Sequence, residues 1–172
     1  MTGNAWNVER FYHTVVNVTD LDRSIAFYRR LGFEVLDDRR DVEWPEFVGR
    51  NFGMRTAQGR GVLMALESDP DGPMLDLIQW LEPDPAEQKV PVPDDLVIPR
   101  IIAFRAKNVR ALYDELGAEG VEFTNDFTGP FEELGVLGVC CVKDPDGTVI
   151  EFIELAPGLR HSQANKALGS RT

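Results

Sequence analysis

The sequence predicts an α+β fold made of two βαβββ modules, and the main reason is an internal repeat. The residues Asp-Pro-Asp-Gly occur at 69–72 and again at 144–147, and each copy leads into an apolar stretch that carries one carboxylate. A shift of 75 positions superimposes these segments, and a shift of 88 superimposes the first strand and helix of each half. Two copies are too few for a solenoid. We therefore expect two modules paired across a pseudo-twofold axis, which together form a cupped mixed sheet.

The first module begins with an expected strand over 11–18, where β-formers are frequent and apolar residues alternate. Thr19 or Asp20 then caps a helix over about 21–31 through its side-chain oxygen, and Gly32 ends that helix. Apolar positions within the helix recur at helical spacing. The remaining strands of this module are expected at 33–37, 61–66 and 74–81.

The segment 82–98 is rich in proline and acidic residues, which excludes a regular element and marks a linker between the modules. The second module repeats the order of the first. Its elements are expected at 100–106 (strand), 109–116 (helix), 122–125, 135–142 and 148–155 (strands). We therefore expect one domain over 8–158, built from modules 11–81 and 99–156, followed by a polar tail over 159–172 that frays.

The segment 41–58 lies between two expected strands and mixes aromatic residues, glycines and arginines. It is too long for a hairpin turn, so we expect a short helix or a flap. Segments of this length inside compact domains often carry function, and a packing insert is the alternative. The pattern leaves its conformation open.

Composition excludes several classes of partner. The formal net charge of −11 disfavours nucleic acid and anionic membrane surfaces, because both require clustered Lys and Arg. No apolar run is long enough to cross a bilayer, and no signal peptide pattern is present. Cys140 and Cys141 are adjacent in an expected strand and point to opposite faces, so packing in a reduced compartment is the favoured role. We expect a soluble, cytoplasmic protein.

Three side chains suggest a site for a divalent metal ion. The repeat aligns Asp76 with Glu151. It also aligns His13, on the first strand of the first module, with Ile101 on the first strand of the second. Each carboxylate alone could simply face water on an alternating strand. Together, one imidazole and two carboxylates are ligands suited to Fe, Mn, Ni, Zn or Mg, with positions left open for substrate oxygens. Without an ion, one of two neighbouring buried acids is expected to hold a proton.

Three segments carry a resemblance to a known family. These are His-Thr-Val-Val-Asn-Val-Thr-Asp-Leu-Asp-Arg-Ser-Ile-Ala-Phe-Tyr at 13–28, Leu-Gly-Phe-Glu-Val at 31–35 and Asp-Pro-Asp-Gly-Thr-Val-Ile-Glu-Phe-Ile at 144–153. The chain resembles the vicinal oxygen chelate superfamily, which includes glyoxalase I, extradiol dioxygenases and bleomycin-binding proteins. The resemblance covers about 11–156 and implies the glyoxalase-like fold, with homodimers as the expected assembly.

The resemblance also implies where a metal would bind. The four ligand positions of the metal-dependent members correspond to His13, Asp76, Ile101 and Glu151 of this sequence. Ile101 departs from the pattern, because its side chain has no lone pair to give a metal. Three ligands can still hold a catalytic ion, and the expected affinity is lower.

Two functions follow from these residues. In the first, a divalent ion chelates two neighbouring oxygens of a small organic substrate, and Glu151, or Asp76, moves a proton in isomerase or lyase chemistry together with His13. In the second, a metal-free protein binds or sequesters an apolar or aromatic small molecule, or performs acid-base chemistry without metal. Ile101 favours the second function. On either interpretation the residues expected to line the ligand site are Trp44, Phe52, Met64, Trp80, Ile101 and Cys141.

Overall fold

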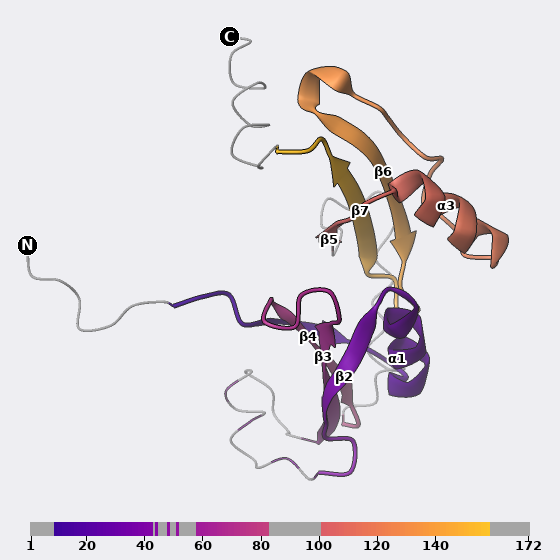
Figure 1. Cartoon of the computed structure of the whole chain (residues 1–172). Helices are drawn as coiled ribbons and strands as arrows, with labels where there is room; N and C mark the ends of the chain where they lie inside the picture. The colour runs from indigo at the N-terminus through magenta and orange to yellow at the C-terminus, as the bar shows by residue number, and fades with distance from the viewer. Residues whose placement is uncertain are drawn as a thin grey trace, which may run out of the picture. The chain divides into compact units, whose positions relative to one another are not determined.

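The computed structural model describes residues 9–42, 44, 48, 51, 58–82 and 101–158. The chain divides into two compact units, Met1–Val92 and Pro93–Thr172, and each is described by itself. In each unit a helix lies along one side of a sheet (Figure 1), which confirms the α+β class. No helix among the described residues is long and apolar enough to cross a membrane.

Unit 1 contains a four-stranded sheet in the order β1-β4-β3-β2. Its elements are β1 (His13–Asn17), α1 (Leu21–Arg30), β2 (Phe33–Asp38), β3 (Gly59–Leu66) and β4 (Met74–Trp80). β1 runs parallel to β4, and the other neighbours are antiparallel. Asp20 caps α1 as predicted, because its Oδ1 atom accepts the backbone N–H of Arg23 at 3.0 Å. The expected first strand is shorter than predicted, and Phe11 is 66% exposed.

The two faces of this sheet differ in burial. One face carries apolar side chains that are almost fully buried, and the helix contributes Leu21, Ile25 and Tyr28 to the same core. The strand residues of this core include Val16, Val62, Met64, Leu75 and Leu77. The alternate residues point to the opposite face, where burial is mixed, since Val15 is 39% exposed whereas Met74 and Ile78 are buried. We call this second surface the open face of unit 1.

Unit 2 contains a three-stranded sheet in the order β5-β7-β6. Its elements are β5 (Ile101–Arg105), α3 (Val109–Ala118), a short 3-10 helix (Glu132–Leu134), β6 (Val136–Lys143) and β7 (Val149–Leu155). β5 is parallel to β7, and β6 is antiparallel to it. The core of this unit includes Val109, Cys140, Val142, Ile150 and Phe152.

The strand predicted at 122–125 is wrong. This stretch makes one isolated bridge, between Phe123 and Val142. The Thr124 backbone N–H donates to the Cys141 carbonyl oxygen, but the polar side chains that follow bond nearby groups, Thr124 with Asn125 and Asn125 with Thr128. Polar side chains that bond nearby groups compete with a regular ladder, so the second module loses one strand of the predicted four.

The strand register confirms the internal repeat. In unit 1, His13 lies opposite Met74 and Val15 lies opposite Asp76. In unit 2, Ile101 lies opposite Val149 and Ala103 lies opposite Glu151. The shifts of 88 and 75 found in the sequence relate every one of these pairs. Asp76 and Glu151 therefore occupy equivalent places in the two sheets.

The same repeat anchors both helices to the last strand of their unit. The side-chain oxygen Oε1 of Gln79 accepts the backbone N–H of Leu21 at 3.4 Å. Oε2 of Glu154 accepts the backbone N–H of Val109 at 3.0 Å. Asn108 precedes α3 in a left-handed conformation, and its side chain makes no capping bond. Glu154 therefore supplies the cap that the preceding residue does not.

Both Asp-Pro-Asp-Gly segments form the same tight turn before the last strand. The N–H of Gly72 donates to the carbonyl oxygen of Asp69, and that of Gly147 donates to Asp144, each at 3.0 Å. In the second copy the buried carboxylate of Asp144 also accepts the backbone N–H of Thr148 at 2.8 Å. The turn thus fixes where each carboxylate-bearing strand begins.

Candidate functional site

His13 and Asp76 lie on neighbouring strands and share the open face of unit 1. Asp76 is opposite Val15, and His13 is two residues before Val15 on the same face. The charges of the two side chains interact, since burial raises the pKa of Asp76 and His13 opposes that rise. The Nδ1 atom of His13 is buried and has no hydrogen-bond partner among the described residues. A buried imidazole nitrogen without a partner is available to a ligand or an ion.

The carboxyl group of Asp76 is half-buried, and this changes its acidity. Burial raises the pKa of Asp76 above its ordinary value, and the nearby His13 and Arg39 oppose that rise. Arg39 is itself paired, because its Nε atom donates to Asp37 at 2.6 Å. A carboxyl group whose pKa is raised by burial is suited to accept and return a proton.

Two tryptophans form an aromatic corner on the same open face. The rings of Trp44 and Trp80 are 5.7 Å apart between centroids and nearly perpendicular, at 87°. The indole Nε1 of Trp80 donates to Oδ1 of Asn17 at 3.0 Å. Gly59 and Gly61 lie directly against the ring of Trp44. Both tryptophans were predicted to line the ligand site; Trp44 lies near Asp76 beside Gly61, and Trp80 lies four residues further along β4.

Glu151 occupies the corresponding place in unit 2. It lies between Ala103 on β5 and Cys141 on β6, and its side chain is partly buried. Burial raises the pKa of the Cys141 thiol, and the charge of Glu151 raises it further. Such a thiol is not an activated nucleophile. Among the described residues, no three His, Cys, Asp or Glu side chains are grouped closely enough to hold a metal ion.

The remaining predicted residues have different environments. Met64 is fully buried and lies opposite Leu75, on the core face, whereas its neighbour Leu63 lies opposite Asp76. Met64 is therefore a core residue, and strand alternation explains why it does not share the face of Asp76. Ile101 is 52% exposed on β5. Phe52 lies outside the described residues.

Sequence reasoning missed Gly59, Gly61 and Arg39 as parts of this face. The signal for the glycines was available, because glycine inside a strand often marks close approach of another group. Their separation by two positions also places both on one face. Arg39 carried no comparable signal, because it follows the strand and reaches the site only through the fold.

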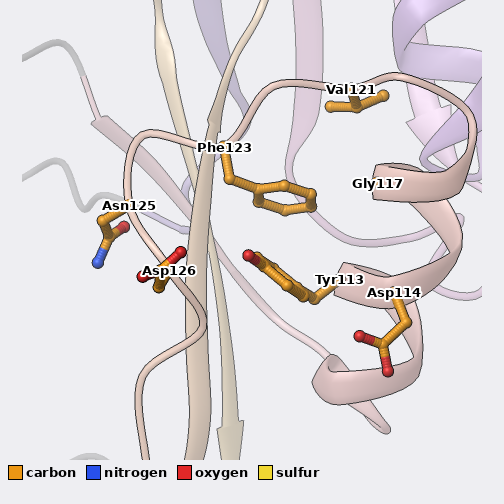
Figure 2. A pocket seen from close by; sticks show the side chains of 7 residues that line it. All are labelled: Tyr113, Asp114, Gly117, Val121, Phe123, Asn125 and Asp126. Atoms are coloured by element: carbon orange, nitrogen blue, oxygen red, sulfur yellow. The ribbon is translucent and has the colours of Figure 1, made fainter.

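A separate hollow of about 710 Å³ lies in unit 2 between α3 and the following loop (Figure 2). It is lined by Tyr113, Asp114, Gly117, Val121, Phe123, Asn125 and Asp126. None of the predicted site residues lines it. The guanidinium of Arg110 lies 5.8 Å from the Tyr113 ring centre and pairs with Asp114 at 3.1 Å. The chain's own arginine thus pairs with one acidic and one aromatic group of this lining, and the open face of unit 1 remains the better candidate.

The chain matches the family model of the Glyoxalase/Bleomycin resistance protein/Dioxygenase superfamily over residues 10–152. A comparison with curated proteins gave no significant match. Several solved structures share the fold. A glyoxalase family protein from Bacillus cereus has a TM-score of 0.70 at 18% identity, over 91% of this chain and 99% of that one.

Two other solved structures differ in their described roles. The trypanothione-dependent glyoxalase I of Leishmania major has a TM-score of 0.59 at 23% identity, over 94% of each chain. TnmS3, an antibiotic binding protein from a Streptomyces species, has a TM-score of 0.56 at 20% identity, over 88% of this chain and 99% of that one. At these identities the likeness concerns the fold alone. The family match covers most of the sequence, and the chain belongs to the Glyoxalase/Bleomycin resistance protein/Dioxygenase superfamily.

Proposed function

We propose that this protein is a metal-dependent enzyme that moves a proton on a small oxygenated organic substrate, in isomerase or lyase chemistry. The observation that carries the proposal is the buried, unpartnered Nδ1 atom of His13 beside the half-buried carboxyl group of Asp76. A buried polar atom left without a partner costs about 1–3 kcal/mol. That cost is offset when an ion or ligand supplies the missing partner.

The donor set fits a divalent ion. His13 and Asp76 present one nitrogen and one carboxylate on the same face of unit 1. Glu151 is the proposed third ligand, because the repeat gives it the position of Asp76 in unit 2. When bound, an ion at these residues supplies Lewis-acid stabilisation of negative charge on substrate oxygens. Iron, manganese, nickel, zinc and magnesium are all compatible with such ligands.

The protein's own groups account for proton transfer and orientation. A carboxylate that is free of the ion is the proposed base that takes a proton from the carbon next to a carbonyl group, and Glu151 is the first candidate. Asp76 is the alternative, because a carboxylate whose pKa is raised by burial is a stronger base. Trp44 and Trp80 pack together on the same face, and Trp44 lies next to Asp76 beside Gly61.

Metal analysis of the full chain, purified without chelators, tests this proposal. We expect about one ion per chain, or full loading after addition of Fe(II), Mn(II), Ni(II) or Zn(II). His13→Ala and Asp76→Asn are expected to lose the ion. His161→Ala is the matched control, because it removes the other histidine of the chain and is expected to keep the ion. Retention of metal by the His13→Ala variant would contradict the proposed ligand set.

A metal-free binding protein is the second proposal, and Ile101 is the observation that favours it. Ile101 replaces the ligand expected at its position and presents an exposed apolar side chain. TnmS3 shares the fold and is described as an antibiotic binding protein. Absence of metal together with tight binding of an apolar compound would support this second function over the first.

A cytoplasmic homodimer is the proposed state of the chain. Many relatives in the superfamily assemble as dimers, which is the basis of this proposal. Sedimentation at micromolar concentration tests it, and monomers alone would contradict it.

A further inference from the structure

The strand β3 carries two glycines, Gly59 and Gly61, that lie against the ring of Trp44. A Cβ atom added at Gly59 would come within 3.0 Å of Cζ3 of Trp44, and one at Gly61 within 3.0 Å of Cζ2. Such distances are shorter than side chains normally keep, so a larger residue would displace the ring. The Trp44 ring packs this closely on β3 because Gly59 and Gly61 have no Cβ atom, and we call these two glycines the seat of the ring.

The orientation of this aromatic corner is held by a second contact. Trp80 lies opposite Gly59 in the sheet, and its ring meets Trp44 edge to face. Its indole N–H donates to the side chain of Asn17 on β1. A partly buried edge-to-face pair with a bonded N–H restricts the Trp44 ring to one place on the open face.

Trp44 lies next to the reactive part of the proposed site. The Cβ position at Gly61 is 3.6 Å from Oδ1 of Asp76, so the ring and the carboxylate border the same residue. The Trp44 side chain is only partly buried, which leaves part of its surface open to a ligand. The accessible part of the indole therefore lies close to the Asp76 carboxyl group.

We propose that Gly59 and Gly61 seat the Trp44 indole so that its accessible surface binds a planar aromatic group of the substrate beside Asp76. This inference rests on the proposed function, because it places the reacting part of the substrate at Asp76. It makes Trp44 a residue that determines specificity and names an aromatic compound with neighbouring oxygens as the substrate class. Contact between two aromatic groups is worth about a two- to tenfold preference in affinity.

Two probes isolate the aromatic contact. Phenylglyoxylate and cyclohexylglyoxylate carry the same neighbouring oxygens and differ in whether the ring is planar and aromatic. We would measure both affinities by calorimetry on the full chain, with and without Mn(II). The wild-type chain is expected to bind the phenyl compound about two- to tenfold more tightly.

Variants test whether the preference for the phenyl compound depends on Trp44 and on the glycines beneath its ring. Trp44→Leu and Gly61→Ala are each expected to abolish the preference, the second because the new Cβ displaces the ring. Phe131→Leu is the control for Trp44→Leu, since it removes a partly exposed aromatic ring from unit 2. Gly117→Ala is the control for Gly61→Ala, because its Cβ would meet only Phe123, at an ordinary 3.9 Å. Both controls are expected to keep the preference, and circular dichroism verifies the fold of each variant.

Several results would overturn the inference. They are equal affinities of the two acids for the wild-type chain, no binding of either, or an unchanged preference in Trp44→Leu. Tighter binding of tetramethylammonium than of both acids would assign the indole to an organic cation instead. If the chain holds metal but shows no ring preference, this inference fails and the proposed function stands. If the ring preference exists in a chain that holds no metal, the proposed function fails and the Trp44 site stands.

Discussion

Replacing Glu154 by Ala should destabilise unit 2, because it removes the cap of α3. Oε2 of Glu154 accepts the backbone N–H of Val109 at 3.0 Å, and Val109 is fully buried. The preceding Asn108 provides no side-chain cap in its place. The N–H group would therefore lose its partner where water reaches it poorly.

The magnitude follows from two contributions. An unsatisfied donor of this kind costs about 1–3 kcal/mol. Loss of a carboxylate near a helix N-terminus adds about 0.3–1 kcal/mol. We expect a total of about 2 kcal/mol, which lowers the melting temperature by about 4–8 °C in a chain of this size. Glu154→Gln should lose much less, because its amide oxygen can still accept the N–H.

Thermal denaturation followed by far-ultraviolet circular dichroism measures this difference. Glu122→Ala is the control, because Glu122 is exposed and its removal should change stability by less than about 0.5 kcal/mol. The reasoning is refuted if Glu154→Ala melts with the control, or if Glu154→Gln is as unstable as Glu154→Ala.

Three further outcomes are expected. Burial raises the pKa of Asp76, so the folded state loses stability as pH rises from below 3.8 through the raised pKa. With both chains freed of metal by a chelator, Asp76→Asn should therefore melt higher than wild type at neutral pH, and the difference should disappear well below pH 3.8; an unchanged or lower melting temperature of the metal-free variant at neutral pH would contradict this. Gly138→Ala should cost about 1–3 kcal/mol in urea titrations, because its Cβ would come within 2.5 Å of the Phe127 ring. Burial raises the pKa of Cys140 from 9.0 to about 11, so its thiolate fraction at neutral pH falls by about 100-fold. Iodoacetamide followed by mass spectrometry should find Cys140 largely unmodified in the native protein, and rapid labelling would show that the thiol is accessible and ionised.

The repeat and most elements could be predicted because their signals are local. The Asp-Pro-Asp-Gly turns close through bonds between residues three apart, and Asp20 caps a helix through a bond to a residue three positions on. Strands and helices are also predicted from the spacing of apolar residues, which alternate in strands and recur every three or four positions in helices, so this signal is local as well. Local bonds also account for the missing strand at 122–125. The side chains of Thr124 and Asn125 bond polar groups nearby, and the stretch keeps only the isolated bridge of Phe123 with Val142.

The site depended on contacts between distant parts of the chain. The sequence alone aligned Asp76 with Glu151 and singled out His13, because a repeat is visible in the order of residues. Only the parallel pairing of β1 with β4 placed His13 and Asp76 on one face. Only the packing of Trp44 on Gly59 and Gly61 revealed the aromatic corner, and only the register of β3 placed Met64 in the core. A shift of one residue in a strand exchanges its two faces, and that choice is made by the whole sheet rather than by any local pattern.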